Sequence, residues 1–243
     1  MYNSLLIITI VFLISMTHCA KDVFEFESSD LHVAKISPFD KRFKLFLKKT
    51  GKEIGHVRFR MRYYKIKGRL FYQTFFNMKL VWSGDYEDKN KIIVENSAII
   101  DHQFKLRSFR GKFTENKKVT KRKGHYIKPY FYINEMGKKM RIYFPDGIFS
   151  HLAEQYLLKH ELKEIGDAVI YQFLNIATLK MEEEHLFLRK REVLKVKGID
   201  TPVKVIRTKN YTVGYRETYW INNESHIVKK SDFNNAIIWK LEN

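Results

Sequence analysis

Apolar and polar side chains alternate almost without a break between residues 43 and 80, and this alternation limits the fold more than any other feature of the chain. In the middle of this segment, three arginines, Arg58, Arg60 and Arg62, alternate with apolar residues. Because successive side chains of a strand point to opposite faces, the arginines lie on one face of a sheet and their apolar neighbours on the other. The pattern predicts half-buried strands over residues 43–47, 57–63 and 70–80.

The third of these segments differs from the first two because both of its faces are partly apolar. Leu70, Tyr72 and Phe76 fall on one face, and Phe71 and Phe75 fall on the other. A strand of this kind leaves apolar side chains exposed to water unless other parts of the protein pack on both of its faces. We therefore expect this strand to be covered on both faces.

Turn residues recur along the rest of the chain and predict a succession of short strands. Gly198, Asn210, Asn222 and Asn234 follow one another at twelve-residue intervals, with β-prone segments between them. This spacing is typical of a meander of antiparallel strands. Earlier turns are expected at residues 83–85, 123–124 and 136–137.

One helix is expected over residues 148–158, after the Pro-Asp-Gly sequence 145–147, with Asp146 as its N-cap. Residues 176–192 fit either a helix or a strand, and we favour a strand. The expected fold is therefore mainly β, of the β-rich α+β class with one or two helices, and the apolar stripe of the helix covers one face of the sheet. That stripe consists of Ile148, Phe149, Leu152, Ala153, Tyr156 and Leu157.

An apolar leader precedes the charged part of the chain. Residues 1–20 contain no charged side chain, and residues 5–14 form an apolar run of about ten residues, which is the length of a signal-peptide core and too short to span a bilayer. We expect a signal peptide over residues 1–19 and a single β-rich domain over residues 20–243. A buried N-terminal strand or helix is the alternative.

The single cysteine, Cys19, falls where such a leader is cut. If Cys19 became the first mature residue, it would resemble the acylated cysteine of a bacterial lipoprotein. If cleavage followed Cys19, then Thr17 and Cys19 would supply the small residues that signal peptidases recognise. Both alternatives predict an exported protein, of the periplasm or an envelope membrane if the source is bacterial, and neither allows a disulfide, because no second cysteine exists.

The charge balance is strongly basic, with 45 Lys and Arg against 27 Asp and Glu and a net charge of +18. Such a charge attracts anionic membrane surfaces and polyanions, although a lysine-rich composition with no ligand would give the same count. Export argues against nucleic acid as the natural partner. The expected partners are a lipid or an anionic membrane surface, or another envelope protein, and the sequence does not indicate an oligomeric state.

The sequence contains none of the familiar catalytic or cofactor-binding motifs, so it predicts no enzyme, no cofactor and no metal. His151 and Glu154 share a helix face at a spacing that can hold a metal, but a solvated helix surface is the more common outcome. The run Glu182 to Glu184 is interpreted as a solvated charge run. An enzyme acting on envelope polymers would require these residues to cluster in a deep cleft.

From residue 144 onward the order of features is similar to that of a family of bacterial envelope proteins. The helix entry at 144–147 and the helix at 148–158 are followed by strand segments at 193–198, 203–207, 219–222, 227–230 and 237–241. This order resembles the DUF3108-type periplasmic proteins, which in turn resemble the lipoprotein carrier LolA. The resemblance implies a curved antiparallel sheet, an open half-barrel, wrapped around a helix. It assigns no functional residue, and Asn222 and Asn223 stand where the family has a glycine in the final turn.

The leading hypothesis is an envelope protein that holds a lipid or acyl chain against the concave face of its sheet. The alternative is a non-enzymatic interaction or scaffold protein, tethered through Cys19, whose basic face contacts polyanions. The residues expected on the apolar side of the ligand site are Phe71, Phe75, Phe76, Phe149, Leu152 and Tyr156. Those expected on its basic rim are Arg58, Arg60, Arg62, Lys105 and Arg107.

Overall fold

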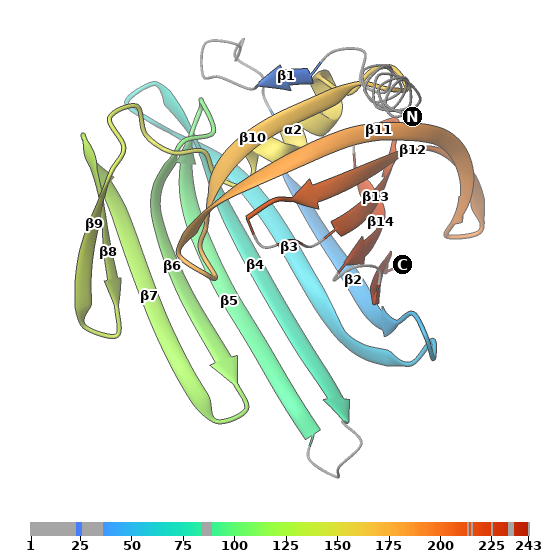
Figure 1. The fold of residues 1–243 in the computed structure, drawn as a ribbon, viewed down its shortest axis with the longest axis horizontal. Coiled ribbons are helices and arrows are strands. Elements are labelled where there is room, and N and C mark those ends of the chain that lie inside the picture. The colour runs from blue at the N-terminus through green and yellow to red at the C-terminus, as the bar shows by residue number, and fades with distance from the viewer. Residues whose placement is uncertain are drawn as a thin grey trace, which may run out of the picture.

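Antiparallel strands make up most of the protein, as the computed structural model shows (Figure 1). The structure describes residues 23–25, 36–83, 89–212, 214, 216–224, 226–232 and 236–242. The strands are β1 (Val23–Glu25), β2 (Phe39–Leu47), β3 (Glu53–Ile66), β4 (Arg69–Ser83), β5 (Lys89–Asp101), β6 (Leu106–Glu115), β7 (Lys118–Ile127), β8 (Tyr130–Glu135), β9 (Lys138–Tyr143), β10 (Ala168–Asn175), β11 (Lys180–Val196), β12 (Ile199–Asn210), β13 (Arg216–Asn222), β14 (Ile227–Asp232) and β15 (Ile237–Leu241). One helix of the described part of the chain, α2 (Ala153–His160), lies between β9 and β10.

The strands form one open, curved sheet in the order β1-β10-β11-β12-β13-β14-β15-β2-β3-β4-β5-β6-β7-β8-β9. Neighbouring strands are antiparallel except β1 and β10, which are parallel. The sheet does not close into a barrel, so β1 and β9 are its edges. The expected β-rich class and the curved, open sheet around a helix are confirmed, as is the meander of short strands from β12 to β15.

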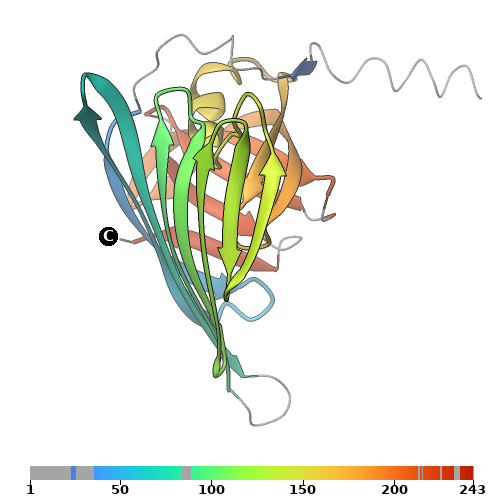
Figure 2. The ribbon, with the colours of Figure 1, turned by 90° about the vertical axis from the view of Figure 1, so that its left-hand side faces the viewer.

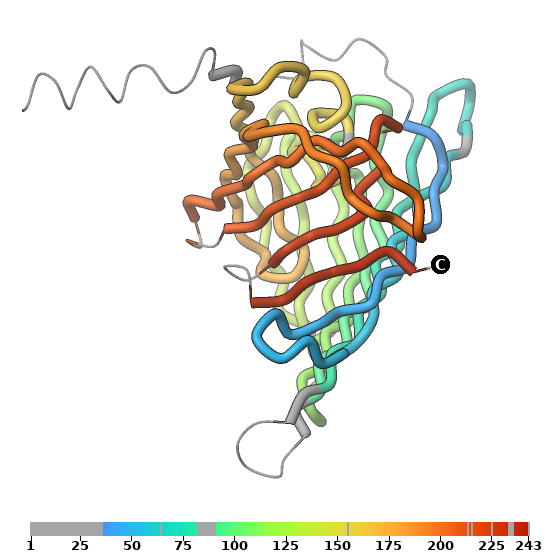
Figure 3. Tube along the Cα trace, turned by 90° about the vertical axis from the view of Figure 1, so that its right-hand side faces the viewer, coloured from blue at the N-terminus to red at the C-terminus, as the bar shows by residue number. Residues whose placement is uncertain are grey.

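The sheet bends so that its two halves face each other. Strands β2–β9 form one half, the N-terminal wall, and strands β10–β15 form the other, the C-terminal wall. They join where β15 pairs with β2, through Trp239 opposite Leu45. Figure 2 shows the N-terminal wall in front of the C-terminal wall, and Figure 3 shows the two from the opposite side.

The helix lies on the inner side of the sheet and helps to form the hydrophobic core. Leu152, Ala153 and Leu157 are buried, and Tyr156 packs against Phe104 at a ring distance of 5.5 Å. The same core includes buried side chains from both walls. The apolar stripe predicted from the sequence is therefore the buried face of α2.

The predicted start of the helix is wrong by one and a half turns. The helix begins at Ala153 after the N-cap residue Leu152, and Asp146 does not cap it. The preceding residues pair with strands instead, because Phe149 forms isolated bridges with Lys105 and with Phe173. These pairings use backbone N–H and C=O groups that would otherwise form the hydrogen bonds of a helix.

The predicted turn at Lys123 and Gly124 is also wrong, since both residues lie within strand β7. Gly124 faces the core, where an added Cβ atom would come within 2.5 Å of the Phe109 ring and 2.6 Å of the Phe131 ring. This glycine serves close packing and not a chain reversal. The turn at Met136 and Gly137, by contrast, connects β8 and β9 as expected.

Several predictions fall outside the described residues: the signal peptide over 1–19, Cys19, most of the turn at 83–85, and the turn residue Asn234. No helix in the described part of the chain has the length and apolar character that a membrane span requires.

Candidate functional site

A cavity of about 650 Å³ lies between the two walls of the sheet. On the N-terminal wall it meets mainly apolar side chains from β2 to β6, and Trp239 closes this part of the lining. Phe76 contacts Phe59 and Trp239 at ring distances of 6.3 Å and 6.4 Å. The apolar lining consists of Phe39, Phe43, Phe59, Phe76, Met78, Leu80, Ile92, Val94, Ala98, Ile100, Phe113 and Trp239.

The opposite lining mixes apolar side chains, such as Phe173, Leu174 and Ile227, with most of the buried ionisable groups of the described chain. It comes from the segment before α2, from α2 itself and from strands of the C-terminal wall. Its charged or titratable members are His151, Glu154, Glu182, Glu217, Tyr219, His226, Lys230 and Asp232. The cavity is therefore amphipathic, mainly apolar on one side and both apolar and ionisable on the other.

Lys230 of β14 is the cation at the centre of this polar side. Its Nζ lies 2.8 Å from Glu217 Oε2 and 3.7 Å from Asp232 Oδ2, and all three side chains are nearly inaccessible. The Tyr219 hydroxyl donates to the same Glu217 oxygen at 2.6 Å. Burial would lower the pKa of Lys230, but Asp232 and Glu217 outweigh it and raise that pKa.

The environment of Glu217 acts on its pKa in two directions, because burial raises it and the charge of Lys230 lowers it. Burial is the main reason why its pKa is raised well above the usual value, and the charge of Asp232 adds to the effect. Burial likewise raises the pKa of the Tyr219 hydroxyl, with Glu154 and Glu217 contributing. Tyr219, Glu217 and Lys230 therefore form one buried hydrogen-bonded network, whose members depend on one another for their partners.

His151 and Glu154 form a second ion pair on the same lining, with 3.0 Å between Nε2 and Oε2. Burial opposes the charged form of each residue, but their mutual attraction wins, so the pKa of His151 is raised and that of Glu154 is lowered. The other oxygen, Glu154 Oε1, is buried without a hydrogen-bond partner among the described residues. The predicted solvated helix surface is therefore wrong for Glu154.

Glu184 lies behind this pair on β11. Burial and the charge of Glu154 raise its pKa to about 7. The Tyr171 hydroxyl donates to Glu184 Oε2 at 2.9 Å. Of these two carboxyl groups, Glu184 is therefore the one whose pKa lies near neutral pH.

Glu182 also faces inward, but neutral groups surround it. Its carboxylate accepts hydrogen bonds from Asn175 Nδ2 at 2.8 Å, Asn210 Nδ2 at 2.8 Å and Thr178 Oγ1 at 3.1 Å. These donors satisfy the buried carboxylate without a counter-charge.

The interpretation of Glu182 to Glu184 as a solvated charge run is therefore wrong for two of its three members. Glu182 and Glu184 are each 1% exposed, and only Glu183 faces outward, where it contacts His185 at 2.8 Å. The strand alternation explains this, because Glu182 and Glu184 have the same parity as the buried Leu186 and Leu188. The alternation could be seen in the sequence, but the charge of these residues favoured an exposed position over a buried one.

The described residues contain no cluster of three or more His, Cys, Asp or Glu side chains arranged to hold a metal ion.

The structure divides the residues predicted for the apolar side of a ligand site into three groups. Phe76 and Leu152 line the cavity. Phe149 and Tyr156 belong to the adjoining core. Phe71 and Phe75 point away from it, on the outer face of β4, because each is an odd number of residues from the cavity residue Phe76.

The residues predicted for a basic rim do not surround the cavity. Arg58, Arg60 and Arg62 extend from the outer face of β3, whereas their neighbour Phe59 lines the cavity. Lys105 is buried, with its Nζ 3.6 Å from the centre of the Phe149 ring. Arg107 pairs with the buried Asp101. Three of the predicted rim residues thus form a row on the outer face of the sheet. The other two, Lys105 and Arg107, interact with Phe149 and Asp101.

Comparison with known proteins gives a likeness of fold. No protein-family model matches the chain, and no curated protein matches it in sequence. It is similar to a solved structure from Brucella abortus described as a beta-barrel-like protein of domain of unknown function DUF1849, with a TM-score of 0.63 and 10% sequence identity. The match covers 86% of this chain and 98% of that one. The likeness supports a barrel-like fold, and the DUF3108 resemblance itself is not shown.

Proposed function

We propose that this protein is an exported, non-enzymatic binding protein that holds an amphipathic ligand with an acyl chain in the cavity between its two walls. Export rests on the apolar leader and the Cys19 region of the sequence. Binding rests on the amphipathic lining, and this is the observation that carries the proposal.

The size and character of the cavity suit such a ligand. Ligand pockets usually measure about 300–1,000 Å³ and combine an apolar lining with a few polar groups that fix orientation. The cavity has about 650 Å³ and an apolar lining drawn from five adjacent strands. Each methylene group transferred from water to such a lining contributes about 0.8 kcal/mol, so a chain of several carbons gains enough to offset part of its ordering cost.

The polar lining favours a head group that can donate hydrogen bonds. The carboxyl groups of Glu154, Glu182, Glu217 and Asp232 all belong to the lining, so the polar side of the cavity is rich in hydrogen-bond acceptors. A hydroxyl, amide or ammonium group would satisfy such an acceptor, whereas a second carboxylate would repel it. We therefore expect a neutral or cationic head group.

A fluorescent acyl probe tests the proposal directly. Wild-type protein should bind the probe in a way that excess unlabelled acyl compound reverses. Met78→Asp places a charge on the apolar lining and should weaken binding at least about tenfold, because a carboxylate is costly to bury without a partner. Asn77→Asp is the matched control, since Asn77 is exposed on the opposite face of the same strand.

A second variant keeps the test decisive if Met78→Asp fails to fold. Ile92 also lines the cavity and is only partly buried, so Ile92→Gln should be tolerated and should weaken binding in the same direction. Equal probe binding by wild type, Ile92→Gln and Asn77→Asp would contradict the proposal. A wild-type protein that binds no probe and co-purifies with another envelope protein would favour the scaffold function.

The ionisable lining supports one other candidate function. His151, Glu154 and the pair Glu217–Lys230 meet in the cavity, which is the clustering that an enzyme of envelope polymers would require. This candidate predicts turnover of a bound lipid or glycan, measured as released product, and its loss in His151→Ala. Recovery of the intact ligand after long incubation would exclude it.

A further inference from the structure

We propose that the outer face of the N-terminal wall docks the protein on a bilayer that contains anionic lipids. This surface, the outer basic face, consists of the outward side chains of β3–β9. It lies on the other side of the sheet from the cavity, so the inference does not depend on the proposed ligand.

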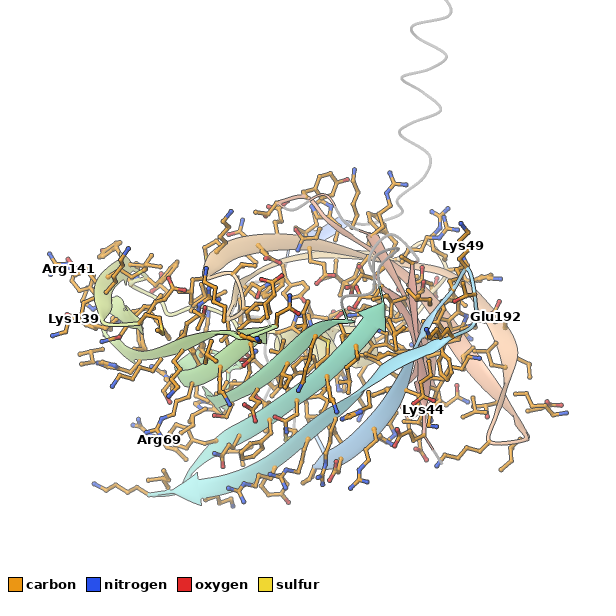
Figure 4. The ribbon with its side chains drawn as sticks, turned by 90° about the horizontal axis from the view of Figure 1, so that it is seen from below. Lys44, Lys49, Arg69, Lys139, Arg141 and Glu192 are labelled. Carbon is orange, nitrogen blue, oxygen red and sulfur yellow. The ribbon has the colours of Figure 1, made fainter. Side chains whose placement is uncertain are left out.

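The strand register gathers cations on this face. One transverse row runs across seven strands with neighbours about 4.7–4.9 Å apart. Its members are Arg60, Phe75, Ser97, Arg110, Lys123, Asn134 and Lys139. Figure 4 labels Lys139 at the outside of this wall, with Arg141 beside it.

Two cross-strand pairs on this face join like charges. Arg110 of β6 lies directly opposite Lys123 of β7, and Lys112 lies opposite Lys121. Directly opposed like charges destabilise a sheet. An anionic partner that screens them would remove this repulsion.

The sheet is also hollowed at these pairs. A depression of about 630 Å³ is lined by side chains from β4 to β8 and by the β8–β9 turn. Its cations include Arg110, Lys112, Lys121 and Lys123, and its one acidic residue, Glu95, already pairs with Lys112 at 2.9 Å. The depression can therefore receive an anionic head group.

Exposed apolar side chains lie at one end of the same face. Ile66, Ile127 and Tyr143 are 48%, 58% and 61% exposed. Each is the last residue of its strand, β3, β7 or β9, and these strands run in the same direction because their neighbours are all antiparallel. Alternation from Arg62, Lys123 and Arg141 places all three on the outer basic face.

This combination favours a bilayer over a soluble polyanion. Interfacial binding adds buried apolar area to electrostatic attraction. A soluble polyanion would use the cations and leave Ile127 and Tyr143 in water. Lys67 and Lys128 lie in the turns that follow Ile66 and Ile127, and Arg69 begins β4. All three are exposed, so cations lie beside these apolar side chains.

Vesicle co-sedimentation tests the inference with vesicles of phosphatidylcholine alone and of phosphatidylcholine with phosphatidylglycerol. Wild-type protein should bind the mixed vesicles and release them as salt increases, and should bind the neutral vesicles weakly. Arg110→Glu with Lys123→Glu should weaken binding on the order of 30-fold, because each cation near the surface adds to the attraction. Lys180→Glu with Lys195→Glu, a matched pair of exposed residues on the C-terminal wall, should change it little.

A second pair of substitutions separates the bilayer from a soluble polyanion. Ile127→Ser with Tyr143→Ser should weaken vesicle binding about tenfold through lost apolar contact, and should leave the binding of soluble polyphosphate unchanged. Polyphosphate binding without vesicle binding would overturn the inference in favour of a soluble polyanion, and equal losses in the 110/123 and 180/195 variants would also overturn it. Probe binding in the cavity should persist in all four proteins, so the two proposals fail separately.

Discussion

The two walls of the sheet differ in the side chains that they turn toward the interior. Both turn one face toward the interior, but the N-terminal wall fills that face with apolar side chains, whereas the C-terminal wall places Glu182, Glu184, Glu217, Lys230 and Asp232 on it. Burying apolar groups is favourable in itself, while burying charges requires partners for each of them. The C-terminal wall is therefore the part whose stability depends on pairing, and it is the part that gives the cavity its polarity.

The largest expected effect comes from removing the central cation of the C-terminal wall. Lys230→Met should cost about 3–5 kcal/mol in free energy of unfolding, because it leaves Asp232 and Glu217 buried without their counter-charge. Urea denaturation measures this loss. Lys229→Met is the control, since Lys229 faces the other way over Trp220 at 4.3 Å and should cost only about 0.5–1 kcal/mol. Equal losses in both variants would remove the contrast between the walls.

The second effect depends on pH. The pKa of Glu184 is raised from 4.5 to about 7 in the folded protein. The folded state therefore binds this proton more tightly than the unfolded state does. The resulting stability is fully present below the pKa of Glu184 in the unfolded chain and is lost as pH rises through about 7. The full loss is about 3 kcal/mol at most, from about 1.4 kcal/mol for each pKa unit. Glu184→Gln, which stays neutral, should raise the melting temperature relative to wild type at pH 8 and change it little at pH 4.5. An increase of the same size at both pH values would contradict the burial of an ionisable Glu184.

A third test applies to the packing of the N-terminal wall. Gly124→Ala forces a Cβ atom between the Phe109 and Phe131 rings, which stack at 5.9 Å. Overpacking of this kind costs about 1–3 kcal/mol. Lys123→Ala, at the adjacent exposed position, should leave the free energy of unfolding nearly unchanged. A fully stable Gly124→Ala protein would show that these rings do not pack as described.

The smallest effect is expected for an ion pair on the outer face of the N-terminal wall. The Lys112–Glu95 pair is about half exposed on both sides, and exposed pairs contribute about 0–1 kcal/mol. Lys112→Gln also removes the repulsion from Lys121, so its net effect on the denaturation midpoint should be close to zero. A loss as large as that of Lys230→Met would contradict the assignment of the structural ion pairs to the interior.

The contrast between the walls also explains how far the sequence alone could be interpreted. Alternation predicted the strands of the N-terminal wall because its apolar residues and its arginines, such as Phe59 and Arg60, obey the same period. The alternation of the C-terminal wall was equally regular, but Glu184 and Lys230 occupy buried positions that the period alone would assign to apolar residues. The charge of these residues suggested a solvent-exposed face of the strand. Only the three-dimensional pairing of Lys230 with Glu217 and Asp232 accounts for the burial of Lys230.

Phe71 and Phe75, two of the predicted ligand residues, lie outside the cavity for a related reason. Alternation within β4 separated Phe75 from Phe76, but the sequence did not indicate which side of the strand faced the cavity. Long-range pairing decides this, since the cavity exists only where the sheet folds back through the contact between β15 and β2. The helix boundary was missed because Phe149 pairs with Lys105 and Phe173, which are far from it in the sequence.

The most direct test of the central claim, an amphipathic ligand between the two walls, is native mass spectrometry of the protein purified from its own host without detergent, followed by organic extraction. We predict a mass above that of the polypeptide by the mass of a lipid, and recovery of an acyl compound in the extract. A bare polypeptide mass with no extractable acyl compound would contradict the claim.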